Sequence, residues 1–169
     1  MLDSHSPLAG LKKEADLRFE RDGISLTESK AFQLTQYAGK MSSIERVTGM
    51  KLEFGKSQNE AGRTVMQVGK DQIWVVGPPL ETRALYPTPL SSGRTRIVLE
   101  GEKARALLFA CAPIDFSPGV FTAGHYAMTG IHHCPVTVHL VRGNTFHLYV
   151  MRTFAASIWE WLVDAAEGL

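Results

Sequence analysis

The chain has 169 residues, of which 44% are hydrophobic and 21% are charged, and its formal net charge is +1. This length and composition are typical of one globular domain, or of two very small ones, that folds without a disulfide or a metal, and they exclude a disordered chain. The charge is also spread evenly, which argues against nucleic acid as a partner because phosphate binding needs a basic excess on one face.

The sequence lacks the features that direct a chain into a membrane or out of the cell. The N-terminus has neither the cationic start nor the apolar run of a signal peptide, and the longest apolar stretch, residues 106–114, is too short to cross a bilayer. Two cysteines, Cys111 and Cys134, are compatible with a reducing compartment. We therefore expect a cytoplasmic protein with no membrane partner.

Residues 1–30 are predicted to form an N-terminal arm, because they are polar and mixed in charge. The one apolar cluster within them is residues 6–11, which include Leu8 and Leu11. We expect this arm to lie over the domain itself or over a partner. Leu8 and Leu11 are its candidate contact residues.

Residues 31–169 are predicted to form a single α+β domain with two similar halves, residues 31–92 and 93–169. The first half begins with alternating apolar and polar side chains at residues 32–37, which indicate a strand. Ser42 or Ser43 can cap a short helix that ends at Gly49. Next come a turn-rich loop at 55–62, strands at 63–68 and 73–76, and a proline-rich segment at 79–93 in which any helix is short and broken.

The second half repeats the strand–helix–strand order. A strand at 94–99 is followed by a helix at 102–110 that carries one apolar stripe. The remaining expected elements are a strand at 120–127, a hairpin of strands 136–141 and 146–150, and a final helix at 154–166.

The hairpin has two registers, and burial of the apolar stripe favours the one with a three-residue loop at 143–145. In that register Leu140 faces Leu148 and Val138 faces Val150, so apolar side chains meet. The other face is mixed, and we interpret it as an interface in which His139 and Tyr149 are candidate contact residues. It contains Thr137, His139, Val141, His147 and Tyr149.

In the final helix, Thr153 is the expected N-cap, and a core-facing stripe follows at helical spacing. Trp159 lies off that stripe, so it is either half-covered by a neighbouring loop or an anchor in an interface. Arg152, just before the helix, is a further candidate contact residue. The stripe consists of Phe154, Ile158, Trp161, Leu162 and Ala165.

No motif predicts a cofactor or metal site. The glycines form no G-x-G-x-x-G pattern, and residues 49–57 resemble a phosphate loop with one intervening residue too many. The adjacent His132 and His133 would point to opposite sides of an extended chain. Zinc ligands usually come as two closely spaced pairs, and His125, His132, His133 and Cys134 do not form two such pairs.

No catalytic set is predicted either, because neither a G-x-S-x-G nor an H-E-x-x-H pattern occurs. Cys111 lies on the apolar stripe of its helix and is interpreted as a buried, inert thiol. Asp115 could act as a base, but an Asp after Pro113 and Ile114 more often caps a turn.

A set of stretches in the right order across nearly the whole chain resembles the gamma subunit of heterotetrameric sarcosine oxidase. The most specific is the C-terminal run R-T-F-A-A-S-I-W-E-W-L at 152–162. The others are S-P-L-A-G-L at 6–11, D-Q-I-W-V-V-G-P at 71–78, S-G-R-T at 92–95 with L-E-G at 99–101 and A-R at 104–105, and C-A-P-I-D-F at 111–116 leading to Phe121.

The resemblance implies a fold related to the folate-binding domain of aminomethyltransferases, with two ferredoxin-like halves, antiparallel sheets and flanking helices. It also implies an accessory subunit that has no catalytic residues and binds no cofactor. Alpha and beta subunits are the implied partners, and they would hold FAD, FMN, NAD and tetrahydrofolate. Such assemblies oxidise sarcosine to glycine and hydrogen peroxide and pass the one-carbon unit to tetrahydrofolate.

A second interpretation is a stand-alone folate-binding protein of the aminomethyltransferase type. Members of that class are longer and have further domains that complete the folate pocket, so we favour the accessory subunit. Related assemblies that oxidise other N-methyl amines also have gamma-like subunits. The amine oxidised therefore does not follow from this chain.

Overall fold

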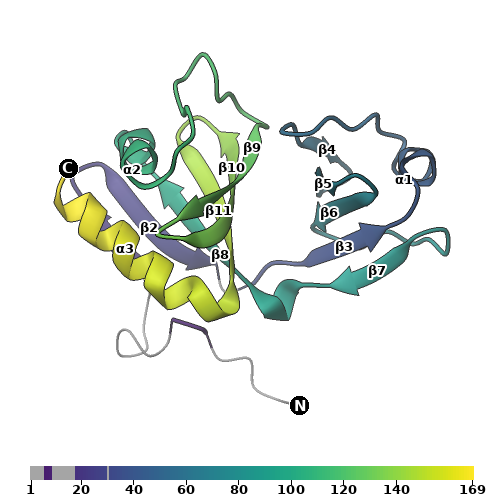
Figure 1. Cartoon of the computed structure of the whole chain (residues 1–169), viewed down its shortest axis with the longest axis horizontal. Coiled ribbons are helices and arrows are strands. Elements are labelled where there is room, and N and C mark those ends of the chain that lie inside the picture. Colours follow the sequence, from purple (N-terminus) through teal and green to yellow (C-terminus); the bar gives the residue numbers. More distant parts are fainter. Residues whose placement is uncertain (1–5, 9–17, 30) are drawn as a thin grey trace. The chain divides into compact units, whose positions relative to one another are not determined.

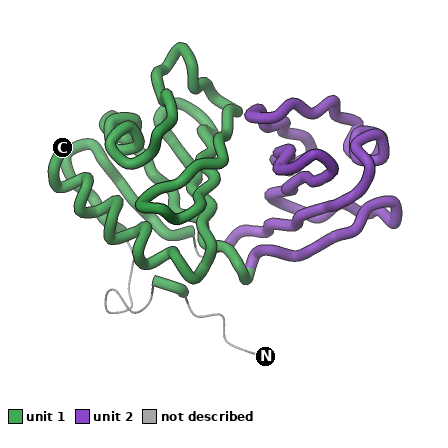
Figure 2. Tube along the Cα trace, viewed as in Figure 1, with its two compact units in different colours: residues 1–30, 92–169 green, residues 31–91 purple. Residues whose placement is uncertain are grey.

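The computed structural model describes residues 6–8, 18–29 and 31–169. The chain forms two compact units, coloured separately in Figure 2. Unit 2 is Ala31–Ser91, and unit 1 combines Met1–Lys30 with Ser92–Leu169. No helix among the described residues is long and apolar enough to cross a membrane.

Unit 1 is built on a six-stranded sheet in the order β1-β2-β8-β11-β10-β9, in which every neighbouring pair is antiparallel. The first two strands come from before unit 2 in the sequence and the other four from after it. The strands are β1 (Arg18–Arg21), β2 (Ile24–Ser29), β8 (Arg94–Glu100), β9 (Tyr126–Ile131), β10 (Cys134–Arg142) and β11 (Thr145–Met151).

One face of this sheet is covered by the helices α2 (Ala104–Cys111) and α3 (Ala155–Glu167), as Figure 1 shows. A short 3-10 helix, η2 (Arg152–Phe154), precedes α3. Every second strand residue points toward the helices, and together they form an apolar core, which is the main stabilising feature of the unit. The sheet contributes Ile24, Leu26, Ile97, Leu99, Val136, Val138, Leu140, Phe146, Leu148 and Val150 to this core.

Unit 2 has a five-stranded antiparallel sheet in the order β4-β5-β6-β3-β7, packed against one helix. Gly49 ends that helix as expected: its φ of 69° is left-handed, a conformation that glycine adopts without strain. The elements are β3 (Leu34–Ala38), α1 (Met41–Thr48), β4 (Gln58–Glu60), β5 (Arg63–Gly69), β6 (Gln72–Val76) and β7 (Tyr86–Pro89). The 3-10 helix η1 (Ser91–Gly93) begins at the last residue of the unit.

The expected arm differs from what the structure shows, since residues 18–29 form β1 and β2. Ile24 and Leu26 alternate with polar residues, and burial of these two side chains in the unit 1 core favours the strand. Before them, Leu8 is fully buried in the same core, and Ser6 Oγ donates a hydrogen bond to Glu28 Oε2. This part of the arm therefore lies over its own domain.

The expected hairpin register is wrong by two residues, although the paired residues keep their expected faces and only Val141 lies in a bulge. Leu140 pairs with Phe146 and Val138 with Leu148, and a bulge lies between Leu140 and Arg142. The extra residue is therefore taken up by a bulge in β10, not by a three-residue loop. A bulge restores the side-chain alternation, so the apolar stripe stays buried.

The expected core-facing stripe of α3 is also wrong in part, because the helix is rotated about its axis. Trp159 is buried in the core, whereas Trp161 and Phe154 are 40% and 36% exposed. Thr153 makes no capping hydrogen bond, because η2 precedes the helix and α3 begins only at Ala155. The buried side chains of α3 are Ala155, Ile158, Trp159, Leu162 and Ala166.

Three shorter segments also differ from expectation. The strand expected at 120–127 begins only at Tyr126, because residues 117–125 form turns and Phe121 packs edge-on against Phe116 at 5.1 Å between ring centroids. The loop expected at 55–62 contains the short strand β4, and the segment 79–93 forms β7 and η1.

Candidate interaction surface

The residues predicted to contact a partner do not gather on one exposed surface. Leu8 and Trp159 belong to the unit 1 core, and Leu11 lies outside the described residues. His139 and Tyr149 are only 3% and 2% exposed, on the sheet face opposite the helices. Arg152, in η2, is half-buried.

The face of the unit 1 sheet opposite the helices carries a polar cluster, which we call the polar face. Cross-strand pairing places His139 opposite His147 and Tyr149 opposite Arg96. The His139 and His147 rings are 6.4 Å apart, the His147 and Tyr149 rings are 6.3 Å apart, and Arg96 Nη2 donates to Ser29 Oγ at 2.6 Å. The polar face consists of Ser29, Arg96, Thr137, His139, His147 and Tyr149.

Burial keeps the two histidines and the tyrosine of the polar face neutral. It lowers the pKa of His139 to about 4, because the imidazolium would lose its hydration. Burial also lowers the pKa of His147 to about 4, and the charge of Arg96, together with that of His139 where it is protonated, acts in the same direction. Burial raises the pKa of Tyr149 to about 12, although Arg96 opposes that shift. At neutral pH, Arg96 is therefore the charged group of this cluster.

The other candidate reactive groups are Cys111, Asp115 and His125, and the surroundings of each favour a structural role. The pKa of the Cys111 thiol is raised to about 11 by burial, which makes it a poor nucleophile. Asp115 Oδ1 accepts a hydrogen bond from Ser117 N at 2.9 Å, the turn cap that its sequence context favours. Hydrogen bonds from the Ser117 side chain and from this backbone N–H lower the pKa of Asp115. His125 Nδ1 lies 3.1 Å from Thr122 N, inside a turn.

Within residues 6–8, 18–29 and 31–169, no three His, Cys, Asp or Glu side chains are placed to hold a metal ion. His132 and His133 both adopt left-handed φ values, 45° and 64°, in the turn between β9 and β10. The His132 ring stacks on Trp161, with 4.1 Å between centroids.

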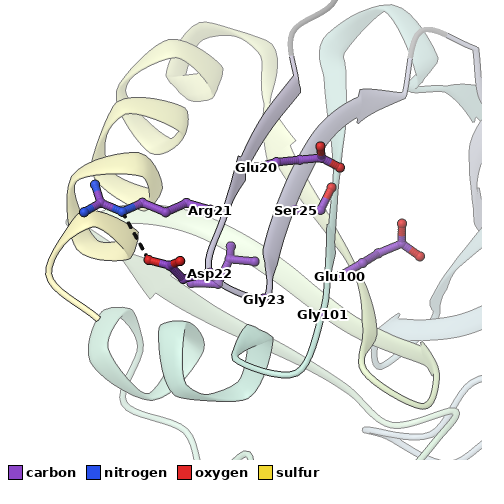
Figure 3. A pocket seen from close by; sticks show the side chains of 8 residues that line it. Glu20, Arg21, Asp22, Gly23, Ser25, Glu100 and Gly101 are labelled. Atoms are coloured by element: carbon purple, nitrogen blue, oxygen red, sulfur yellow. Dashed lines mark ion pairs between the residues drawn. The ribbon is translucent and has the colours of Figure 1, made fainter.

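A hollow of about 410 Å³ opens beside the β1–β2 turn, next to the end of β8 (Figure 3). Glu20, Ser25 and Glu100 are cross-strand neighbours along it. Arg21 is engaged by Asp22 at 3.6 Å and by Glu167 at 3.8 Å. The carboxylates that line the hollow, those of Glu20, Asp22 and Glu100, are exposed to solvent. The hollow therefore has no buried polar group that would select a ligand.

Close backbone packing forms the floor of this hollow. Gly101 has a φ of 120°, and a Cβ at this position would lie 2.0 Å from the carbonyl oxygen of Gly23. Any larger residue would therefore separate the β1–β2 turn from the end of β8. This glycine has a packing role.

Arg105 is an organising residue that the sequence interpretation missed. Its Nη1 donates to the carbonyl oxygen of Phe116 and, at 3.1 Å, to that of Phe121, while its Nε donates to Asn144 at 3.2 Å. Its guanidinium also lies 5.4 Å from the centre of the Phe146 ring. Arg105 thus holds the loop that leads to β9. The sequence feature that indicates such a role is that Arg105 is the one charged residue in the otherwise apolar helix α2.

Large exposed apolar side chains mark the surface where a partner could bind, since aromatic and methionine side chains are enriched in interfaces. In the described part of unit 1, those at least 40% exposed are Phe109, Val120, Met128, Trp161 and Leu169. Met128 is on the edge strand β9, and Trp161 stacks on the turn that follows it.

The family model described as "Sarcosine oxidase, gamma subunit family" matches residues 82–168, just over half of the chain. The chain therefore belongs to the sarcosine oxidase gamma subunit family. No curated protein sequence matches it.

Two solved structures share the fold. A chain of the heterotetrameric sarcosine oxidase from Corynebacterium sp. U-96, in complex with pyrrole 2-carboxylate, matches with a TM-score of 0.79 and 21% identity, over 97% of this chain and 95% of that one. Aminomethyltransferase T of the glycine cleavage system from Bartonella henselae matches with a TM-score of 0.60 and 13% identity, over 85% of this chain and 46% of that one. The fold is α+β with two antiparallel sheets and three helices in the described residues.

Proposed function

We propose that this chain is a non-catalytic gamma-type subunit that assembles with, and stabilises, the flavin-bearing alpha and beta subunits of a sarcosine-oxidase-type enzyme. The observation that supports this most is the match to one chain of a heterotetrameric sarcosine oxidase over nearly the full length of both chains. The family membership points in the same direction.

A non-catalytic role is supported by the state of the groups that could react. His139 and His147 are buried and neutral, and His139 has a pKa of about 4, too low for a general base at neutral pH. Cys111 is a protonated thiol at neutral pH, and Asp115 is engaged in a turn. The ring neighbours of the two histidines include each other and Tyr149, whose pKa burial raises to about 12, so this cluster contains no activated base.

The chemistry of the assembly is assigned to the partner subunits. They would bind FAD, FMN, NAD and tetrahydrofolate, oxidise sarcosine to glycine with formation of hydrogen peroxide, and pass the one-carbon unit to tetrahydrofolate. The gamma-type subunit would bind none of these cofactors, and it would act in the cytoplasm with its partners.

The finer form of the fold belongs to the same proposal: each unit is a ferredoxin-like half. Its support is the order of four strands in each sheet. In unit 2 the order β7-β3-β6-β5 corresponds to 4-1-3-2 along the chain, and in unit 1 the order β2-β8-β11-β10 is the same with the fourth strand taken from before unit 2. Such halves would relate the chain to a folate-binding domain.

Co-expression tests the proposed function. The tagged chain, expressed with the alpha and beta subunits of a sarcosine oxidase, is expected to co-purify in stoichiometric amounts and to raise the fraction of flavin retained after gel filtration. Sarcosine oxidation should depend on the partner subunits and not on His139 or Cys111. A chain that elutes apart from the partners under all salt conditions would contradict the proposal.

A second candidate is a stand-alone folate-binding protein, favoured by the likeness of the fold to aminomethyltransferase T. The chain spans less than half of that protein's length, so a pocket completed by further domains would be open here. Calorimetric titration of the isolated chain with tetrahydrofolate separates the two. Saturable heat at micromolar ligand would favour the folate-binding protein, and its absence at high micromolar ligand would remove it.

A further inference from the structure

The outer edge of β9 presents backbone groups that no described strand pairs, because β9 is the last strand of its sheet. Its other edge pairs with β10 through a two-residue turn, in which Ile131 lies opposite Cys134. In such a hairpin the closing pair exchanges both backbone hydrogen bonds, and the bonded pairs alternate from there. Ala127 and Thr129 therefore bond to β10, whereas the N–H and C=O groups of Met128 and Gly130 point outward.

A proline supports this assignment of direction. Gly130 lies opposite Pro135, which has no N–H and fits only where the pair exchanges no hydrogen bonds. Met128, two residues earlier, shares the outward direction of Gly130. The outer edge of β9 thus offers two donors and two acceptors in line, spaced for another strand.

The other sheet edges in the described residues are protected against strand addition, and this one is not. β1 has the sequence R-F-E-R, β4 is three residues long and ends in Glu60, and β7 contains Pro87 and Pro89. Charges, shortness and prolines are the usual devices that keep an edge from pairing. β9 has the sequence Y-A-M-T-G-I, without a charge or a proline.

The uncharged character extends well beyond β9. Residues 116–141 contain no Asp, Glu, Lys or Arg, in a chain of which 21% of residues are charged. Met128 is 53% exposed and Trp161, stacked on His132 at the end of the strand, is 40% exposed. An unprotected edge beside exposed aromatic and thioether groups, with charge depleted around it, matches the central part of a protein interface.

We propose that the outer edge of β9 binds an extended, uncharged segment of a partner subunit, which adds a strand to the unit 1 sheet. This inference rests on the proposed function and names the surface that performs it. Such an occupant has the unpaired N–H and C=O groups that the edge requires, and charged side chains at its centre would lose hydration beside Met128. The match to a chain of a heterotetramer favours an unlike subunit over a second copy.

Two measurements on the full chain and a purified alpha–beta assembly test the proposal. Met128→Pro removes the outward N–H without removing a bond to β10, and prolines are tolerated at such edge positions. It should weaken binding at least about ten-fold, the loss expected for one interface hydrogen bond and a displaced strand. The matched control Met128→Ala keeps the N–H and should weaken binding less than about three-fold, and urea unfolding checks both variants.

Hydrogen–deuterium exchange on the unsubstituted chain provides the second measurement and does not depend on a variant folding. In the isolated chain the amides of Met128 and Gly130 should exchange fast, while those of Ala127 and Thr129 are protected by β10. In the assembly, protection should appear at Met128 and Gly130.

Each outcome is decisive. If the unsubstituted chain binds the assembly while Met128 and Gly130 still exchange fast and Met128→Pro binds equally well, the edge proposal is overturned and the proposed function stands. If the unsubstituted chain does not bind, the proposed function fails and the edge proposal with it. Protection of both amides in a dimer of the isolated chain would show a second copy as the occupant and overturn the partner-subunit assignment.

Discussion

The two faces of the unit 1 sheet differ in chemistry, but at the centre of β10 and β11 they hardly differ in burial. On the helix-covered face, Val138 and Leu148 are fully buried, and on the polar face His139 and Tyr149 are 3% and 2% exposed. The first face is stabilised by removing apolar surface from water, which is insensitive to pH. The second is buried at a cost that depends on the protonation of its groups. Polarity alone therefore does not tell which face of a strand is exposed.

The largest expected effect concerns the apolar face and compares two tryptophans of α3. Trp159→Ala should lower the free energy of unfolding by about 3–5 kcal/mol, because it leaves a cavity in the core. Trp161→Ala, at a position 40% exposed, should cost below about 1 kcal/mol. Urea denaturation of both variants measures the difference. Equal losses of unfolding free energy in the two variants would contradict the burial of Trp159 and the exposure of Trp161.

The next effect belongs to the polar face and is a loss of stability in acid. The pKa of His139 is about 4 in the folded chain, and its ordinary value is 6.5. Between pH 4 and pH 6.5 the unfolded chain therefore binds a proton at His139 that the folded chain does not bind. Stability is full above pH 6.5 and falls as the pH drops toward 4, by about 2 kcal/mol at pH 5 from His139 alone. His147 acts in the same direction.

Urea unfolding at pH 8, 6 and 5 measures this dependence. His139→Gln should flatten the decline, whereas the matched variant His132→Gln, at an exposed turn position, should leave it unchanged. A stability that stays constant from pH 8 to 5 would contradict the burial of a neutral imidazole on this face.

A smaller effect is expected from the hydroxyl of Tyr149. Tyr149→Phe removes its hydrogen bond with Arg96 and keeps the ring, so it should cost about 1 kcal/mol. Tyr86→Phe is the control, because Tyr86 is 78% exposed and its loss of a hydroxyl should be neutral. Thermal unfolding compares the two variants, and no difference between them would place the Tyr149 hydroxyl in water.

The smallest effect, and the only gain, concerns a polar group on the apolar face. Thr95 pairs with Val150 and is 3% exposed, and its Oγ1 finds no hydrogen-bond partner among the described residues. Thr95→Val should therefore raise stability by up to about 1 kcal/mol, because a buried hydroxyl without a partner carries its desolvation cost. A loss of more than about 1 kcal/mol in urea unfolding would show that the hydroxyl is bonded.

Local patterns in the sequence predicted most of the elements and few of their partners. The strands at 63–68, 73–76 and 94–99 and the helix ended by Gly49 follow from periodicity and a left-handed cap, which depend on neighbouring residues only. Residues 18–29 are expected to belong to an arm, because the strand character of β2 depends on pairing with β8, about seventy residues away, and β1 in turn pairs with β2.

The candidate contact residues were less predictable for the same reason. Trp159 and Trp161 lie on nearly opposite sides of one helix, and the packing of α3 on the sheet decides which of them is buried. The edge of β9 is recognisable only once the strand order is known, because a strand is an edge by its position in a sheet. Arg105 likewise acquires its role from the loop that folds back onto it.

The sequence by itself determined the α+β class, the absence of known cofactor and catalytic motifs, the resemblance to gamma subunits and the two-sided alternation of the hairpin. These features depend on composition and on spacings of a few residues. Only the tertiary structure decided that His139 and Tyr149 of the polar face are buried, that a bulge sets the hairpin register and that β9 is the unprotected edge. Each of these depends on contacts between segments far apart in the chain, whose free energies exceed local preferences.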